Sequence, residues 1–117
     1  MIGSMNRVIL FVKDVPACAA FYRDVLGLQP TDHADAGWVP FDAGGCALAL
    51  HKATPGKRPS DGTRSVQIVF KVSDVVATRD ALIAKGVAMG KLWDVDGEFA
   101  FCDGADPEGN LFQISSR

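Results

Sequence analysis

Several features that would mark a membrane, nucleic-acid-binding or disulfide-stapled protein are missing from this sequence. No apolar run approaches the roughly 18 residues of a membrane span, and the start, MIGSMNR, lacks the build of a signal peptide. A net charge of −2 leaves no basic excess for nucleic acid. The three cysteines are an odd number with no CxxC pair, which predicts reduced thiols. We therefore expect a cytoplasmic protein that binds neither membrane nor nucleic acid.

Familiar catalytic motifs are missing as well. No serine lies in a GxSxG turn, and no cysteine has a histidine at a recognisable spacing. Asp103, Asp106 and Glu108 cluster near the C-terminus, but Asp-Pro-Glu-Gly at 106–109 is the composition of a tight turn. The turn explains these carboxylates better than paired catalytic acids do. The sequence therefore identifies no catalytic residue.

What the sequence does contain is an internal repeat. Residues 7–28, RVILFVKDVPACAAFYRDVLGL, return in weaker form at 67–87, QIVFKVSDVVATRDALIAKGV, with Asp14 on Asp74. A 117-residue chain fits one domain, whose two halves are too small to hold a core alone. The expected parts are an expression-vector scar at 1–5, a first module at 6–51, a connector at 52–65 and a second module at 66–117.

Each module is expected to run strand, helix and three more strands. Asp14 and Asp74 are suited to capping the two helices, and Gly27 and Gly86 to ending them. In the first module we expect strands at 8–12, from 28, at 38–41 and at 46–50. In the second we expect strands at 66–72, 87–93, 98–102 and 110–115 and a helix at 75–85. The connector, rich in proline, glycine and basic residues, is either a solvated loop or a loop that attracts anions.

Three motifs carry a family resemblance. FYRDVLGL ends the first helix, VSDV opens the second module and DPEGNLFQI precedes the C-terminus. With paired βαβββ modules, they resemble the vicinal-oxygen-chelate superfamily, which contains glyoxalase I, bleomycin-resistance proteins and extradiol dioxygenases. The resemblance implies an α+β fold in which a curved eight-strand mixed sheet surrounds a cup, with helices outside. It also implies a homodimer, in which the modules of each cup come from one chain or from two.

Strand periodicity predicts which side chains face the cup. Along the first strand Arg7, Ile9 and Phe11 share one side, while the all-apolar alternate set should meet the helix. Relatives that bind a metal place ligands at four inward points, which fall here on Arg7, Ala49, Gln67 and Gln113. A fixed cation, a methyl group and two neutral amides do not suit a divalent ion. We therefore expect no metal and no other cofactor.

The same inward positions offer groups for an organic ligand. Arg7 suits a carboxylate, phosphate or sulfate, and Gln67 and Gln113 can donate and accept hydrogen bonds. Flat apolar walls are expected from Phe11, Trp38, Trp93 and Phe101. His51 is the histidine placed to act as an acid or base near the cup, and His33 is a weaker candidate. The alternatives are a local partner for Arg7, core packing for the aromatic residues and an exposed loop for His51.

Three functions follow from this reading. The first is a metal-free protein of the bleomycin-resistance kind that binds a small polar or anionic molecule. The second is an enzyme, either a metal-dependent glyoxalase-like lyase, isomerase or dioxygenase, or a metal-free catalyst. The third is a dimeric interaction module with a vestigial cup.

Overall fold

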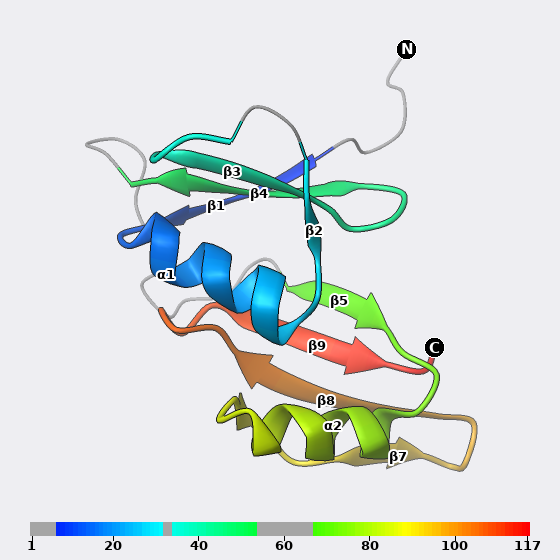
Figure 1. Cartoon of the computed structure of the whole chain (residues 1–117). Coiled ribbons are helices and arrows are strands. Elements are labelled where there is room, and N and C mark those ends of the chain that lie inside the picture. Colours follow the sequence, from blue (N-terminus) through cyan, green and yellow to red (C-terminus); the bar gives the residue numbers. More distant parts are fainter. Residues whose placement is uncertain (1–6, 32–33, 54–66) are drawn as a thin grey trace. The chain divides into compact units, whose positions relative to one another are not determined.

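A computed structural model describes residues 7–31, 34–53 and 67–117 (Figure 1). The chain divides into two compact units, Met1–Asp61 and Gly62–Arg117. The expected vector scar, His33 and most of the connector lie outside the described residues.

The first unit packs a helix against one face of a mixed sheet. Its strand order is β1-β4-β3-β2, in which β1 runs parallel to β4 and the other neighbours are antiparallel. Its elements are β1 (Arg7–Val12), α1 (Val15–Ala20), η1 (Phe21–Val25), β2 (Gln29–Pro30), β3 (Trp38–Asp42) and β4 (Ala47–Lys52).

The first helix begins and ends as the sequence predicts but changes its winding midway. The backbone N–H of Ala17 donates to Asp14 Oδ1 over 3.0 Å at the N-terminus, and Gly27 has a φ of 79° beyond the C-terminus. From Phe21 onward the helix is a π-helix, which helical spacing did not predict. The wider turn lets the consecutive rings of Phe21 and Tyr22 both be buried.

The second unit repeats this plan. Its strand order is β5-β9-β8-β6, with β5 parallel to β9, and β7 also pairs with β8. Asp74 caps the helix by accepting from the Ala77 N–H over 2.9 Å, and Gly86 follows it with a φ of 85°. The elements are β5 (Ile68–Lys71), α2 (Val75–Ala84), β6 (Ala88–Met89), β7 (Trp93–Val95), β8 (Phe99–Ala105) and β9 (Leu111–Ser115).

The prediction of an eight-strand curved sheet is not exactly confirmed. The described residues form one sheet of four strands and one of five. The extra strand arises because the expected strand at 87–93 is broken after Met89. The Gly90 N–H still donates to the Asp103 carbonyl on β8 over 2.7 Å, but the Gly90 carbonyl accepts from side chains, Arg79 Nε over 2.9 Å and Cys102 Sγ over 3.2 Å. Strand pairing with β8 then resumes at Trp93. The α+β class itself is confirmed.

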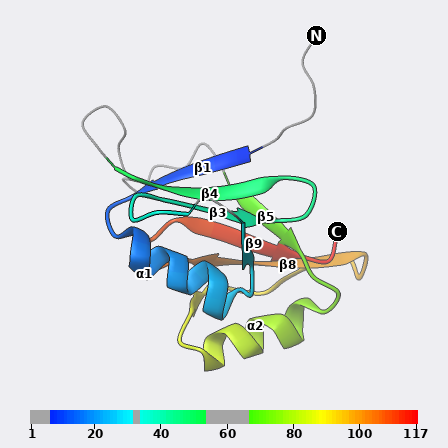
Figure 2. The same ribbon diagram turned by 45° about the horizontal axis from the view of Figure 1, so that its top comes forward.

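In each unit the helix lies on one face of the sheet (Figure 2), and the core lies between them. In the first unit α1 contacts β3 and β4, and in the second α2 contacts β6, β8 and β9. No described element of the same unit covers the opposite face of either sheet, which we call the open face. The buried apolar side chains include Val12, Cys18, Tyr22, Phe41, Leu48 and Leu50 in the first unit and Val75, Leu82, Cys102, Phe112 and Ile114 in the second.

The alternation predicted along the first strand of each module is confirmed. Arg7 and Ile9 are exposed while Val8 and Leu10 are partly buried, and β5 repeats the pattern. The sheets therefore turn their polar and mixed positions toward their open faces, which is where a functional site has to be sought.

Gly104 offers a test of the packing on the helix side of the second sheet. A Cβ atom at Gly104 would lie 2.6 Å from Met89 Sδ and 2.6 Å from Phe112 Cζ. Met89 can move, but Phe112 is fully buried. We expect Gly104→Ala to lower the free energy of unfolding by about 1–3 kcal/mol, as overpacked cores do. Urea denaturation measures this, and Gly45→Ala, at an open site, is the matched control.

Candidate functional site

The open face of the first sheet carries three rings in one row across the strands. Phe11 on β1 pairs in register with His51 on β4, which pairs with Trp38 on β3. The His51 ring lies 5.3 Å from the Phe11 ring and 5.8 Å from the Trp38 ring, measured between centroids. Three residues singled out in the sequence therefore meet on one surface.

Arg7 reaches the same surface from the other end of β1. Its guanidinium carbon lies 5.3 Å from the centroid of the Trp38 ring, a cation–π contact. Arg7 pairs with Ala47 and Trp38 pairs with His51, and Ala49 lies between these two positions on β4. The side chains of Arg7 and Trp38 therefore approach each other diagonally across the sheet, above Ala49. Ala49 is fully buried although it lies on the open face. We call Arg7, Phe11, Trp38, Ala49 and His51 the Arg7 face.

The hydrogen bond of His51 fixes which ring nitrogen is free. Nδ1 lies 2.7 Å from the Lys52 carbonyl oxygen. Because a carbonyl oxygen only accepts, Nδ1 must carry the proton. In the neutral ring Nε2 then keeps its lone pair, so the imidazole can accept a proton or a hydrogen bond on the Arg7 face.

The open face of the second sheet gathers two predicted residues around a third that the sequence reading missed. Gln67 Nε2 donates to Asp103 Oδ1 over 2.8 Å, and Gln113 Nε2 donates to the same oxygen over 3.0 Å. Asp103 was assigned to the turn before the last strand, but β8 extends to Ala105 and includes it. Continuing the alternation from Phe101 by two residues would have identified it. We call these residues the Asp103 cluster.

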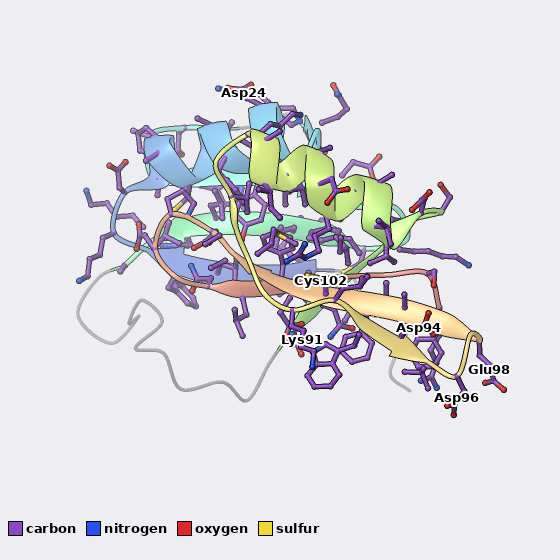
Figure 3. All side chains as sticks on the ribbon, turned by 90° about the horizontal axis from the view of Figure 1, so that it is seen from below. Asp24, Lys91, Asp94, Asp96, Glu98 and Cys102 are labelled. Carbon is purple, nitrogen blue, oxygen red and sulfur yellow. The ribbon has the colours of Figure 1, made fainter. Side chains whose placement is uncertain are left out.

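Aromatic rings lie beside this cluster. Trp93 and Phe101 are 6.4 Å apart between centroids and nearly parallel, and Phe99 follows 6.2 Å from Phe101. The two outer rings, those of Trp93 and Phe99, each make a cation–π contact with a side chain of the protein. Lys91 Nζ, on the loop labelled in Figure 3, lies 4.4 Å from the Trp93 centroid, and the Arg117 guanidinium carbon lies 5.0 Å from that of Phe99. We call Trp93, Phe101 and Phe99 the aromatic row.

Four of the eight predicted site residues lie in the first unit and four in the second, in each case on the open face of that unit's sheet. Arg7, Phe11, Trp38 and His51 belong to the first unit and Gln67, Trp93, Phe101 and Gln113 to the second. Gln67 precedes β5 instead of lying on it. Glu98, whose orientation the sequence left open, lies in the β7–β8 turn and points outward (Figure 3).

The described residues hold no group of three or more histidine, cysteine, aspartate or glutamate side chains that could bind a metal ion. The shifted pKa values lie elsewhere. Hydrogen bonding to Asp24 raises the pKa of Arg23, and the same bond lowers the pKa of Asp24; this exposed pair is on η1 and not on the open face of its own sheet. Neither group contributes to the candidate site.

Paired modules of one strand order, each with a helix on one face and polar and aromatic side chains on the other, define a duplicated βαβββ protein. The family comparison agrees with this architecture. The model of the Glyoxalase/Bleomycin resistance protein/Dioxygenase superfamily matches residues 4–114, and the chain belongs to that superfamily. No curated protein sequence gives a significant match.

Solved structures share the fold at low sequence identity. A lactoylglutathione lyase from Agrobacterium tumefaciens is 20% identical, with a TM-score of 0.78 over 97% of this chain and 93% of that one. TnmS3, an antibiotic binding protein from Streptomyces sp. CB03234, is also 20% identical, with a TM-score of 0.78 over 97% and 94%. An integron cassette protein from the Halifax Harbour sewage outfall metagenome is 19% identical, with a TM-score of 0.78 over 99% and 100%. Such identities establish the fold alone.

No described helix is long and apolar enough to cross a membrane. The cytoplasmic location stays a prediction from the sequence.

Proposed function

We propose that this protein binds a small organic anion with an aromatic ring on its Arg7 face, without a metal ion. The observation that carries the proposal is the guanidinium of Arg7 held 5.3 Å from the Trp38 ring. Arginine presents donors in a planar fork that fits a carboxylate or phosphate, and the neighbouring indole and imidazole offer flat surfaces for a ring. The antibiotic-binding protein among the similar structures supports a binding role.

Arg7 also argues against a metal at this position. A guanidinium stays protonated and repels a divalent cation, and Ala49 provides no ligand atom. His51 Nε2 is the one nitrogen of the Arg7 face suited to a metal. A single imidazole does not make a structural or catalytic metal site.

The test uses hydrocinnamate, a phenyl ring with a carboxylate, and follows Trp38 by fluorescence and by its indole N–H resonance. We expect saturable binding to the wild type that is insensitive to EDTA. Arg7→Ala should weaken it about tenfold, the order of one lost charge-assisted hydrogen bond at an exposed site. Lys71→Ala, which removes one positive charge from the second sheet, should leave it unchanged.

Two results would overturn the proposal. One is equal affinity in the wild type and Arg7→Ala, because the anion would then bind without the guanidinium. The other is binding that disappears with EDTA and returns with Zn²⁺, Ni²⁺ or Mn²⁺, because a metal would then hold the ligand.

A second candidate is a glyoxalase-like lyase or isomerase, and His51 is the observation that favours it. With Nδ1 bonded to the Lys52 carbonyl, Nε2 is free to take a proton from a substrate held at Arg7. One solved relative of the same fold is a lactoylglutathione lyase. Turnover of a hemithioacetal that His51→Gln abolishes, with elemental analysis of the untagged protein, would favour this candidate over simple binding.

The expected homodimer is a further proposal. Ile9 and Val69 on the open faces are 41% and 53% exposed, and apolar surface on a sheet face is where a second copy can bind. A second copy would remove this apolar surface from water. Sedimentation equilibrium at micromolar concentration distinguishes a dimer from a monomer.

A further inference from the structure

The Asp103 cluster presents hydrogen-bond acceptors to a ligand. Its two glutamines therefore recognise a different kind of ligand from the anion expected from the sequence. From the sequence, Gln67 and Gln113 were expected to donate to an anion as readily as to accept. Both Nε2 atoms instead donate to Asp103 Oδ1, at 2.8 Å and 3.0 Å. An amide turned the other way would set its oxygen against a carboxylate oxygen, so the carboxylate fixes both amides.

The atoms left for a ligand are therefore oxygens. Asp103 Oδ2 accepts no hydrogen bond from any described residue, and neither amide Oε1 accepts one within the described part of the chain. Asp103 is also partly buried, where its charge is less screened than at a fully exposed site. An anion would be repelled here, whereas an ammonium group could donate its three N–H bonds to this set.

The neighbouring aromatic row also attracts cations. Phe101 precedes Asp103 by two residues on β8, about 7 Å along the same face of the strand. The outer rings already hold Lys91 and Arg117 within 4.4 Å and 5.0 Å of their centroids. Phe101, between them, has no such cation among the described residues. A ligand whose aromatic ring lies against Phe101, and whose ammonium group is two carbons from that ring, would place the ammonium group at Asp103.

We infer that the second sheet holds a recognition site for a primary arylalkylamine, in which Asp103 binds the ammonium group and the aromatic row contacts the ring. Gln67 and Gln113 are positioning residues that hold the carboxylate in place. The inference rests on the proposed small-molecule binding function. It differs from that function in two respects, because the site is on the second sheet and the ligand is a cation instead of an anion. A hard metal ion suits the cluster poorly, since it offers one carboxylate where such ions take several charged oxygens.

The experiment compares three probes that share a phenylethyl skeleton: phenethylamine, phenethyl alcohol and hydrocinnamate. Binding is followed by NMR through the side-chain amides of Gln67 and Gln113 and the two tryptophan indole N–H signals. Trp38→Phe assigns the signals, because it leaves the indole of Trp93 alone. We expect millimolar or tighter binding of phenethylamine that shifts both glutamine amides and the Trp93 indole.

Asp103→Asn should weaken phenethylamine binding about tenfold, since it removes the charge but keeps an acceptor oxygen. Asp96→Asn removes the same charge from the tip of the same hairpin, and asparagine tolerates the φ of 51° at that position. This control should change the affinity less than about twofold, because an exposed distant charge is screened. A dispersed amide spectrum for each variant shows that it folds.

Three results would overturn the inference: no shift at the glutamine amides with phenethylamine, equal affinity in Asp103→Asn, or equal binding of the alcohol. The outcome is separable from that of the proposed function. Hydrocinnamate that perturbs Trp38 alone supports the Arg7 face whatever the amine does, and amine binding at Trp93 supports the Asp103 site whatever the anion does.

Discussion

Asp106→Ala is expected to lower the free energy of unfolding by about 2–4 kcal/mol, the largest loss of stability expected from a single polar side chain among the described residues. Asp106 is only 5% exposed in the turn between β8 and β9. Its Oδ1 accepts from the N–H groups of Glu108 and Asn110 over 2.9 Å and 2.8 Å, and its Oδ2 accepts from Asn110 Nδ2 over 2.8 Å. Alanine would leave donors of the equally buried Asn110 without acceptors.

Two matched variants distinguish the contribution of burial from that of the hydrogen bonds within the turn. Asp106→Asn keeps an oxygen for the backbone N–H groups but sets an amide against Asn110 Nδ2, so we expect roughly half the loss. Asp94, on β7 next to the β7–β8 turn, is exposed and accepts one bond, from the Gly97 N–H over 2.8 Å. Asp94→Ala should therefore cost less than about 1 kcal/mol. Urea denaturation followed by circular dichroism measures all three, and an equal cost for Asp106→Ala and Asp94→Ala would contradict the prediction.

The sequence was sufficient for features that depend on local chemistry. The capping aspartates Asp14 and Asp74, the terminating glycines and the Asp106 turn each follow from neighbours within a few residues, and all are present. The duplicated strand order follows from the repeat, because two copies of one pattern bury their apolar faces in one way. Alternation along β1 likewise placed Arg7 and Ile9 on the face opposite the helix, and both are exposed.

Features that depend on partners from distant segments were not predictable. The break after Met89 depends on Arg79 reaching the Gly90 carbonyl, and nothing near residue 90 encodes that bond. Asp103 resembled a turn residue because three carboxylates follow Cys102 closely, yet its role depends on Gln67, which is 36 positions away. The direction of the two glutamine amides depends on the same bonds, so the charge preference of the second sheet could not be read from the sequence.

The fold also explains why the Arg7 face tolerates only a small residue at its centre. Ala49 is fully buried between β1 and β3, although its methyl group lies on the open face. Arg7 and Trp38 start two residues to either side of it along the sheet and meet above it. A larger side chain would occupy the space in which the guanidinium and the indole approach each other.

Ala49→Leu is accordingly expected to weaken hydrocinnamate binding by about thirtyfold or more, a larger effect than Arg7→Ala. The reason is that leucine would displace both the charge that pairs with the carboxylate and the ring that supports the phenyl group. Ala49→Ser, which is nearly the same size, should retain wild-type affinity, and Ala88→Leu, an exposed site in the second unit, should leave both affinity and stability unchanged. Titration by tryptophan fluorescence, with thermal unfolding of each variant, measures the effect. Wild-type affinity in a folded Ala49→Leu protein would mean that the ligand does not contact the Arg7–Trp38 pair.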